Sequence, residues 1–218
     1  MNMNILIISG GSVNKKTAAS LLSKEKYDMI LAADAGLAVC HDLGILPTEV
    51  LGDFDSLKNQ ELLKSCQDQG ITIHRYDSHK DYTDTDLILR LAAGKKPDSI
   101  TLLGASGTRL DHTLANIGLL AGMADEGIPC RILDDHNCVE MLKGPATKEY
   151  PRDPDWPYLS VLAASPQVTG ITLKGFAYPL DRGQIRAFEG RGISNEITGE
   201  KGIVSVESGY LLVIRAID

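Results

Sequence analysis

The first 135 residues alternate short apolar runs with segments in which apolar residues recur every three or four positions. A short, continuous apolar run is typical of a strand buried on both faces, and the wider spacing is typical of an amphipathic helix. Strands that alternate with helices in this way predict an open α/β sheet. We predict strands at 4–9, 28–33, 71–76, 99–103 and 128–134, and helices near 15–24, 35–43, 57–69, from 83 or 84 onwards, and at 112–125.

The pattern changes after residue 135. Residues 144–157 are rich in proline and charge, and no helical period is visible beyond them. Short strand-like runs separated by turn residues predict a small all-β domain. We therefore divide the chain into an α/β domain, 1–137, and an all-β domain, 138–218. The expected strands of the second domain are 158–164, 168–173, 184–188, 203–207 and 210–217, with 138–142 as a further candidate.

Composition narrows the class of protein. The chain has 218 residues, 43% of them hydrophobic, and a formal net charge of −7, which argues against a general nucleic-acid or anionic-membrane binder. No apolar run approaches the length of about 18 residues that a membrane span needs, and no basic segment precedes the first strand, so we expect no signal peptide. The four cysteines form no CxxC pair, which fits reduced thiols in the cytoplasm.

An acidic pair follows the short apolar run at 49–51. Asp53 and Asp55 are two residues apart, and in an extended segment this spacing places both carboxylates on one side, with Phe54 on the other. Adjacent carboxylates repel each other, and a hard divalent cation would compensate for that repulsion. The alternative is a turn in which Asp55 or Ser56 caps the following helix.

A second acidic cluster, 79–86, precedes the helix that starts near Thr83. Asp81 and Asp84 are three residues apart and would share a helix face. Acidic residues in a first helical turn often only favour the helix dipole, and that would explain one or two of them. Three aspartates in six residues exceed what capping requires, so this cluster is a second candidate metal site.

Two glycine-rich turns follow predicted strands. Residues 9–12, Ser-Gly-Gly-Ser, come after the first strand, and residues 104–112 come after the strand at 99–103. Such turns often hold phosphate because main-chain N–H groups can approach it closely, although a plain tight turn explains 9–12 about as well. Arg109 could bind phosphate through its guanidinium, or form a structural ion pair with Asp111. His112 is more simply a polar residue of the first helical turn than an acid–base group.

These clusters share one edge of the predicted sheet. The carboxyl ends of parallel strands lie together, and this edge is where open α/β sheets bind ligands. Carboxylates beside one arginine suit magnesium and a polyphosphate, because the metal bridges carboxylate and phosphate oxygens. The residues therefore predict metal-dependent phosphoryl or pyrophosphoryl transfer, and they leave the acceptor open.

The chain resembles thiamine pyrophosphokinase (thiamine diphosphokinase) in its bacterial form. The matching motifs occur in the family's order and cover nearly the whole chain; they are 33–36 (ADAG), 51–56 (LGDFDS), 80–84 (KDYTD), 104–112 (GASGTRLDH), 175–180 (GFAYPL) and 192–195 (GISN). The resemblance implies a three-layer α/β/α nucleotide domain with a mainly parallel sheet, a C-terminal β-sandwich, and a homodimer with active sites at the subunit interface. It also implies transfer of pyrophosphate from ATP to the thiamine hydroxyl, with release of AMP.

The resemblance further assigns roles to individual positions. Tyr178 would stack on thiamine where other members can carry Trp, although a half-buried strand or turn residue is the simpler interpretation of that position. Ser194 and Asn195 would lie near thiamine. A metal-dependent nucleotide phosphohydrolase and a non-catalytic nucleotide sensor remain alternatives. The predicted catalytic residues are Asp53, Asp55, Asp81, Asp84, Asp111 and Arg109; the first four would hold Mg²⁺, and ATP or thiamine would contact Asp34, Gly36, Thr83, Gly104, Gly107, Arg109, Tyr178, Ser194 and Asn195.

Overall fold

The computed structural model describes residues 3–54, 60–76 and 81–218, which form two compact units. The N-terminal unit runs to Leu119 and includes Gly127–Asp135. The C-terminal unit comprises Leu120–Glu126 and His136–Asp218. Each unit is described separately below.

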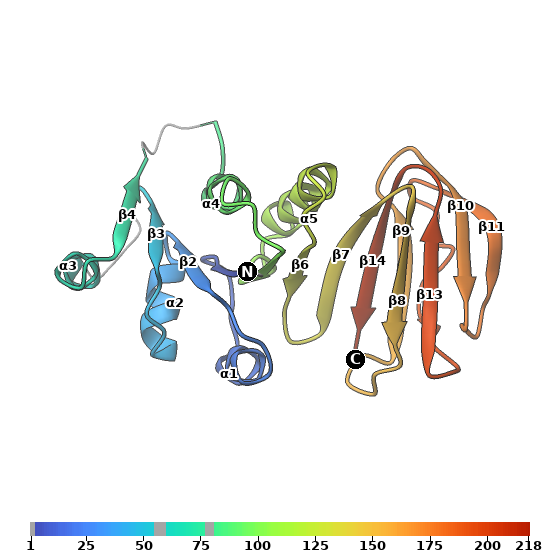
Figure 1. Cartoon of the computed structure of the whole chain (residues 1–218), viewed down its shortest axis with the longest axis horizontal. Coiled ribbons are helices and arrows are strands. Elements are labelled where there is room, and N and C mark those ends of the chain that lie inside the picture. Colours follow the sequence, from blue (N-terminus) through green and yellow to red (C-terminus); the bar gives the residue numbers. More distant parts are fainter. Residues whose placement is uncertain (1–2, 55–59, 77–80) are drawn as a thin grey trace. The chain divides into compact units, whose positions relative to one another are not determined.

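A parallel sheet forms the centre of the N-terminal unit (Figure 1). All its neighbouring strands pair in parallel, in the order β6-β5-β1-β2-β3-β4. The chain therefore builds outward from β1 to β4, returns, and continues on the other side with β5, so a topological switch point lies between β1 and β5. The strands are β1 (Asn4–Ile8), β2 (Met29–Ala33), β3 (Glu49–Gly52), β4 (Thr72–Arg75), β5 (Ser99–Leu103) and β6 (Cys130–Leu133).

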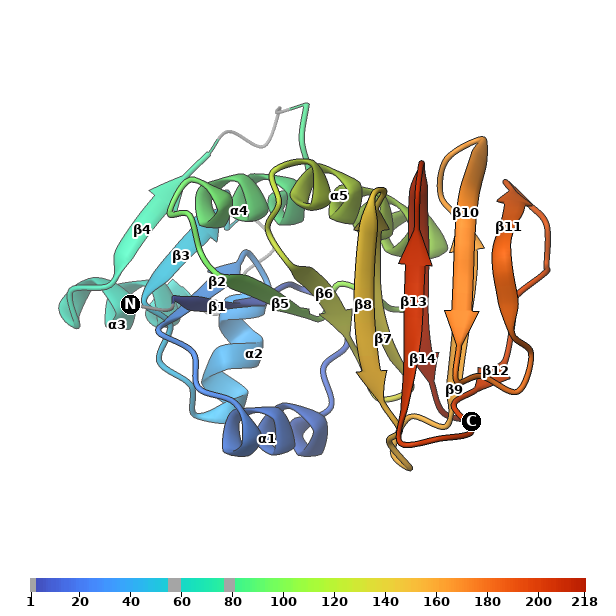
Figure 2. The same cartoon turned by 45° about the vertical axis from the view of Figure 1, so that its right-hand side comes forward.

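Helices cover both faces of this sheet, which makes three layers (Figure 2). On one face lie α1 (Lys15–Lys24), α2 (Gly36–Leu43) and α3 (Gln60–Asp68), and on the other lie α4 (Asp84–Ala93) and the first part of α5 (Leu110–Asp125). The central strands are fully buried, as their continuous apolar runs predicted. The predicted strands and helices are confirmed within the described residues, whereas the predicted start of α3, at 57–59, lies outside them; β3 is an additional strand, and α5 starts two residues earlier than expected.

An ion network lies at the amino end of β3, the end of the sheet opposite the glycine-rich turns. The carboxylate of Glu49 accepts a hydrogen bond from Lys95 Nζ at 2.6 Å and lies 2.7 Å from His74 Nε2. Burial alone would raise the pKa of Glu49, but the two basic partners hold it below its ordinary value. This network therefore favours the charged carboxylate and ties β3 to β4 and to the end of α4.

The C-terminal unit is a β-sandwich of two antiparallel sheets, ordered β12-β9-β14-β7 and β11-β10-β13-β8. Apolar residues of both sheets form one core, with Val161 and Val213 on one side and Ile171 and Val204 on the other. This confirms the predicted fold class. The strands are β7 (Asn137–Lys143), β8 (Ala146–Pro151), β9 (Tyr158–Ala163), β10 (Gln167–Lys174), β11 (Leu180–Arg186), β12 (Asn195–Glu196), β13 (Lys201–Val206) and β14 (Tyr210–Ala216).

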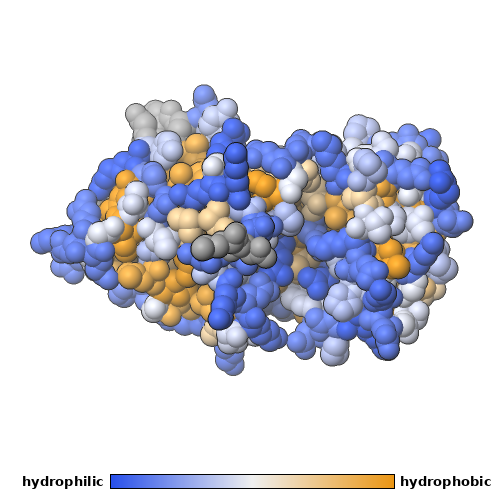
Figure 3. Space-filling view, viewed as in Figure 1, coloured by the Kyte–Doolittle hydropathy of each residue, from blue (hydrophilic) through white to orange (hydrophobic). Residues whose placement is uncertain are grey.

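The surface drawn in Figure 3 is mostly hydrophilic, with apolar side chains in separate areas. Within the three described ranges, no helix is long and apolar enough to cross a membrane. The four cysteines are buried and free, and burial raises the pKa of the thiols of Cys40 and Cys130 to about 12. These thiols are therefore protonated, and they act as apolar core groups.

Candidate functional site

A cavity of about 590 Å³ opens at the carboxyl ends of the strands of the N-terminal unit. It lies at the switch point between β1 and β5, where open α/β sheets bind ligands. The two glycine-rich turns that follow these strands form much of its wall. Its lining comprises residues 9–12, 33–35, 83–85 and 104–109, with His112, Thr113 and Asn116.

The two glycine-rich turns touch each other through their main chains. Ser9 N donates to Leu103 O at 2.8 Å, and Gly11 N donates to Gly104 O at 2.9 Å. A Cβ on Gly11 would lie only 2.3 Å from Gly104 O, so any side chain there would push the turns apart. Glycine is therefore needed at Gly11 for this close approach.

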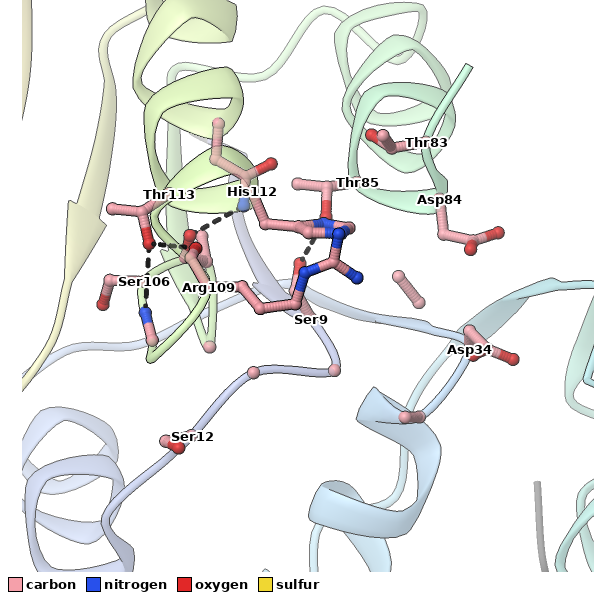
Figure 4. A pocket seen from close by; sticks show the side chains of 18 of the residues that line it. Ser9, Ser12, Asp34, Thr83, Asp84, Thr85, Ser106, Arg109, His112 and Thr113 are labelled. Atoms are coloured by element: carbon pink, nitrogen blue, oxygen red, sulfur yellow. Dashed lines mark hydrogen bonds between the residues drawn. The ribbon is translucent and has the colours of Figure 1, made fainter. Parts of the chain in front are cut away.

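Two side chains of α5 hold the second turn in place (Figure 4). The Thr113 hydroxyl accepts from Gly107 N and donates to Arg109 O, both at 3.2 Å. Asn116, which is buried, donates from Nδ2 to Ala105 O at 2.7 Å. These bonds tie the turn to α5 at three points.

The first turns of three helices border the cavity. Helix α2 begins at Gly36, α4 at Asp84 and α5 at Leu110, next to cavity-lining residues in each case. Thr83 caps α4, because its hydroxyl accepts from Asp86 N at 3.2 Å. Helix amino ends present main-chain N–H groups and a partial positive charge, which together attract anions. The wall of this cavity therefore suits phosphate.

Two predicted aspartates contribute to the cavity lining. Asp34 and Asp84 come from the end of β2 and the start of α4, and Figure 4 shows both at the same side of the cavity. Asp34 has a left-handed backbone, with φ at 42°, and its N–H donates to Leu51 O at 2.7 Å. Carboxylate oxygens beside a phosphate-binding wall are suitable ligands for a hard divalent cation.

Asp53 does not line the cavity; it follows β3, the strand that pairs with β2, which leads to Asp34. It is half-buried and directly follows Gly52, whose Cβ position would be 3.1 Å from the Cα of Asp34. The backbone that carries Asp53 is therefore packed against the backbone of a cavity aspartate. Its predicted partner Asp55 lies outside the described residues.

The expected extended geometry around the first acidic pair is wrong. Strand β3 ends at Gly52, and Phe54 has a left-handed backbone, with φ at 62°. The Phe54 ring is buried, and the guanidinium of Arg75 lies 5.5 Å from its centre. Packing of this ring turns the chain immediately after Asp53, so simple two-residue alternation does not hold there.

Asp81 and Asp111, also predicted as catalytic, are exposed and do not line the cavity. Asp111 instead accepts two hydrogen bonds from Arg109, from Nη2 at 2.6 Å and from Nε at 3.2 Å. This ion pair raises the pKa of the guanidinium and lowers that of the Asp111 carboxyl to about 2. The structural ion pair that we considered from the sequence is thus present, and it lies at the edge of the cavity because Arg109 also lines it.

The predicted metal set is incomplete among the described residues. No group of three or more His, Cys, Asp or Glu side chains in ranges 3–54, 60–76 and 81–218 is arranged to hold a metal ion. Of the four predicted ligands, Asp84 lines the cavity, Asp53 is half-buried outside its lining, and Asp81 is exposed; Asp55 lies outside the described residues.

Of the remaining residues predicted to contact the nucleotide, some line the cavity and one lies behind the lining. Gly104 and Gly107 line the cavity together with Thr83 and Arg109. Gly36 is buried behind the lining, where a Cβ would lie 2.0 Å from Ile8 O. Its role in the structure is to let α2 start close to β1.

The predicted thiamine residues belong to the C-terminal unit. Tyr178 is 74% exposed, which corrects the simpler expectation of a half-buried turn residue. Ser194 is exposed and has a left-handed backbone, with φ at 53°, and its N–H donates to Ser160 Oγ at 2.9 Å. Asn195 is buried, and its amide bonds to the backbone of Tyr178.

Several cavity groups were not identified from the sequence. The hydroxyl groups of Ser9 and Thr85 lie 3.3 Å apart and join the first turn to α4, and Ser106 Oγ donates to Asp134 Oδ2 at 2.6 Å. Ser9 and Ser106 lie in the two predicted glycine-rich turns and Thr85 lies in the first turn of α4, but no pattern singled out their hydroxyl groups. Serine and threonine are so common at caps and turns that their position does not distinguish a ligand-binding hydroxyl.

Comparison with known proteins covers both units. Residues 20–132 match the family described as "Thiamin pyrophosphokinase, catalytic domain", and residues 149–211 match "Thiamin pyrophosphokinase, vitamin B1 binding domain". The first match includes most of the cavity lining, and the second includes Tyr178, Ser194 and Asn195.

Similar proteins extend over the full length of the chain. Thiamine pyrophosphokinase of Bacillus subtilis (strain 168) is 34% identical over 214 residues, which cover 98% of this chain and 99% of the relative. A crystal structure of the Bacillus subtilis enzyme has a TM-score of 0.88 at 33% identity, covering 99% of both chains. That of thiamin pyrophosphokinase from Geobacillus thermodenitrificans has a TM-score of 0.85 at 31% identity, covering 99% of this chain and 98% of the other. With both domain matches in order, this degree of identity along the whole length shows that the chain belongs to the thiamin pyrophosphokinase family.

Proposed function

We propose that this protein transfers the pyrophosphoryl group of ATP to the hydroxyl of thiamine, giving thiamine diphosphate and AMP. The observation that carries the proposal is the cavity at the β1/β5 switch point, bordered by three helix amino ends. Main-chain N–H groups and helix dipoles suit a polyphosphate. The relatives named above are thiamine pyrophosphokinases, and they match this chain from end to end.

Magnesium is the metal that this site would hold. Carboxylates are the ligands that Mg²⁺ takes in phosphate sites, usually one or two of them together with phosphate oxygens and water. The described carboxylates fit that requirement, because Asp34 and Asp84 both line the cavity. We assign Asp53, Asp55, Asp81 and Asp84 as the candidate ligands. When bound, the metal would neutralise charge between these carboxylates and the phosphates.

The side chains of the site would orient the phosphates and manage charge. Arg109, at the cavity edge, would exchange its contact with Asp111 for phosphate oxygens, since both are charge-assisted partners of a guanidinium. The turn held by Thr113 and Asn116 would keep its shape during this exchange. One of the aspartates would accept the proton of the thiamine hydroxyl as it attacks in line. Positioning and charge neutralisation would supply most of the rate.

Thiamine would bind through the C-terminal unit. The thiazolium ring is a flat cation, and the exposed ring of Tyr178 offers an aromatic face for stacking and cation–π attraction. Ser194 is also exposed, as is its neighbour in the sequence, Ile193, at 47%. We accordingly assign residues 1–137 as the nucleotide-binding catalytic domain and residues 138–218 as the thiamine-binding domain.

We further infer that the protein is a homodimer whose two subunits share each active site. We also infer that the protein is located in the cytoplasm. Both units expose large apolar side chains. In the N-terminal unit, Leu110 and Leu114 of α5 are 72% and 67% exposed, and in the C-terminal unit Phe188 and Ile193 are exposed like Tyr178. Apolar groups on a surface are typical of a contact between subunits. The free, buried cysteines agree with a reducing compartment.

A substrate-dependence assay tests the activity. The purified protein is incubated with ATP with and without thiamine, each with and without magnesium, and AMP and thiamine diphosphate are quantified by chromatography. We expect equal amounts of both products, only when thiamine and magnesium are present. AMP or phosphate release that is independent of thiamine would identify a phosphohydrolase instead.

A matched pair of variants then tests the site. Asp84→Asn removes a carboxylate of the cavity, whereas Asp86→Asn removes one from the same turn of α4 that does not line the cavity and pairs with Arg90 at 2.6 Å. We expect Asp84→Asn to abolish most turnover and Asp86→Asn to leave it within about twofold, because the carboxylate of Asp86 pairs with Arg90 and does not line the cavity. Equal losses in both variants would contradict the assignment of this cavity.

A further inference from the structure

The side chain of Asn195 forms three hydrogen bonds in the C-terminal unit. Its Oδ1 accepts from Tyr178 N at 3.0 Å and from Glu196 N at 3.0 Å, and its Nδ2 donates to Tyr178 O at 2.8 Å. Both main-chain polar groups of Tyr178 are therefore bonded to a single side chain. The backbone of Asn195 is itself fixed, since it pairs with Leu159 of β9.

The segment that carries Tyr178 is anchored to the same part of the chain at its start. Thr198 N donates to Gly175 O at 3.0 Å, and Ala177 N donates to Glu196 O at 2.9 Å. Gly175 has φ at 80°, and a Cβ there would lie 2.5 Å from Lys201 O, so the turn requires glycine. These anchors hold residues 175 to 177, and only the amide of Asn195 holds Tyr178 among the hydrogen bonds described for this segment.

Asn195 has little capacity left for a ligand. A primary amide has two N–H donors and an oxygen with two lone pairs. Both lone pairs and one N–H are already bonded to main chain, and the side chain is buried, with the residue 2% exposed. The ring of Tyr178, by contrast, is presented to solvent. The resemblance-based expectation that Asn195 contacts thiamine is therefore replaced by a different role.

We propose that Asn195 is a positioning residue for thiamine binding: its buried amide fixes the backbone of Tyr178 and thereby the exposed ring on which thiamine stacks. This inference rests on the proposed function, because it needs thiamine as the ligand of Tyr178. An ordered aromatic ring binds a flat cation better than a mobile one, since less conformational entropy is lost on binding. Asn195 would thus raise thiamine affinity without touching thiamine.

Two substitutions of Asn195 test this role by comparing their effects on the KM for thiamine and on the KM for ATP. Asn195→Ala removes all three bonds, and Asn195→Asp keeps the acceptor but places an oxygen against Tyr178 O. We expect either variant to raise the thiamine KM by about two- to thirtyfold, the range of a lost aromatic–cation contact, with the ATP KM unchanged. The control is Thr198→Val, which removes a long 3.3 Å bond to Gly175 O, a group that Thr198 N already satisfies. Unchanged thiamine KM in both Asn195 variants overturns the proposal.

A double-mutant cycle separates positioning from direct contact. If Asn195 acts through the Tyr178 ring, Asn195→Ala has no further effect on thiamine KM once Tyr178→Ala has removed that ring. If Asn195 touches thiamine, the two effects multiply. If the effects of the two substitutions on thiamine KM multiply, the proposal is overturned, although the wild type still shows thiamine-dependent activity. Failure of the proposed function would instead appear as no thiamine-dependent product from the wild type.

A fluorescence measurement reports the position of the ring without substrate. Trp156 is the only tryptophan, so a Trp156→Phe, Tyr178→Trp background places a single reporter at the stacking position. We expect time-resolved anisotropy to show faster local motion when Asn195→Ala is added, and no change when Thr198→Val is added. Equal local motion with and without Asn195→Ala overturns the proposal, and a thermal melt of each variant verifies that the sandwich is folded.

Discussion

Gly36→Ala tests whether the close packing of α2 against the end of β1 is needed to form the cavity. The Cβ of alanine would lie 2.0 Å from Ile8 O, 2.8 Å from the Ile8 carbonyl carbon and 3.2 Å from the carbonyl carbon of Ser9. All three atoms are main chain, so no side-chain rotation relieves the overlap, and α2 must move away from the end of β1. Overpacking of this kind costs about 1–3 kcal/mol, and contact with backbone places the cost at about 3 kcal/mol. The helix preference of alanine over glycine returns at most about 1 kcal/mol.

The expected net loss is therefore about 2 kcal/mol, which corresponds to a decrease in Tm of about 4–8 °C for a chain of this length. Movement of α2 also displaces one of the three helix amino ends of the cavity, so the ATP KM should rise while the thiamine KM stays constant. Thermal melts followed by circular dichroism and steady-state kinetics measure the two effects. The matched control is Gly118→Ala, because nothing lies within 4 Å of a Cβ at that position of α5. If Gly36→Ala melts at the temperature of Gly118→Ala and keeps the wild-type ATP KM, the packing argument is wrong.

Four further outcomes are expected. Asp53→Asn should reduce turnover by far more than it reduces Tm, because we assign its carboxylate to the metal and not to the packing of the core; a large loss of Tm with full activity would make Asp53 structural. Arg109→Lys should raise the ATP KM and leave the thiamine KM unchanged, since lysine keeps the charge but loses the two-pronged phosphate contact, and normal kinetics would exclude Arg109 from the phosphate site. Tyr178→Ala subunits mixed with Asp53→Asn subunits should regain some activity if the site is shared, and verified subunit exchange with no recovery would contradict a shared site. The pKa of Glu49 is lowered on folding, so its contribution to stability is present above about pH 4.5 and is lost as pH falls through the lower folded value; the stability difference from Glu49→Gln in urea unfolding should therefore shrink from pH 7 to pH 3.5.

The periodicity of the sequence predicted most of the fold because each pattern corresponds to one kind of burial. Fully buried strands such as β1 need continuous apolar runs, and helices that cover a sheet need one apolar face. Strand β8 was missed for a physical reason. It lies at an edge of its sheet, where four of its six residues are exposed and only Tyr150 is buried, and Pro151 is tolerated at its end. A central strand is recognised by its apolar run and by its lack of proline. An edge strand such as β8 has neither feature.

The site was harder to predict than the fold because much of it consists of main chain. Sequence motifs located the glycine-rich turns and Asp84, which the structure places at one cavity. They did not show that Phe54 turns the chain after Asp53, since that depends on the packing of one ring. Nor did they show that the amide of Asn195 bonds inward, because a residue's name does not indicate which way its side chain points.

The hydrogen bond from Gly11 N to Gly104 O makes the contact between the two turns observable in solution. Its proton belongs to an amide that is slow to exchange with deuterium only while the turns touch. Exchange at Gly11 therefore reports the separation of two segments that are about ninety residues apart in the chain and that both line the cavity. Most substitutions in these turns leave main-chain N–H groups in place, so a conventional alanine scan would underestimate how much of this cavity is built from backbone.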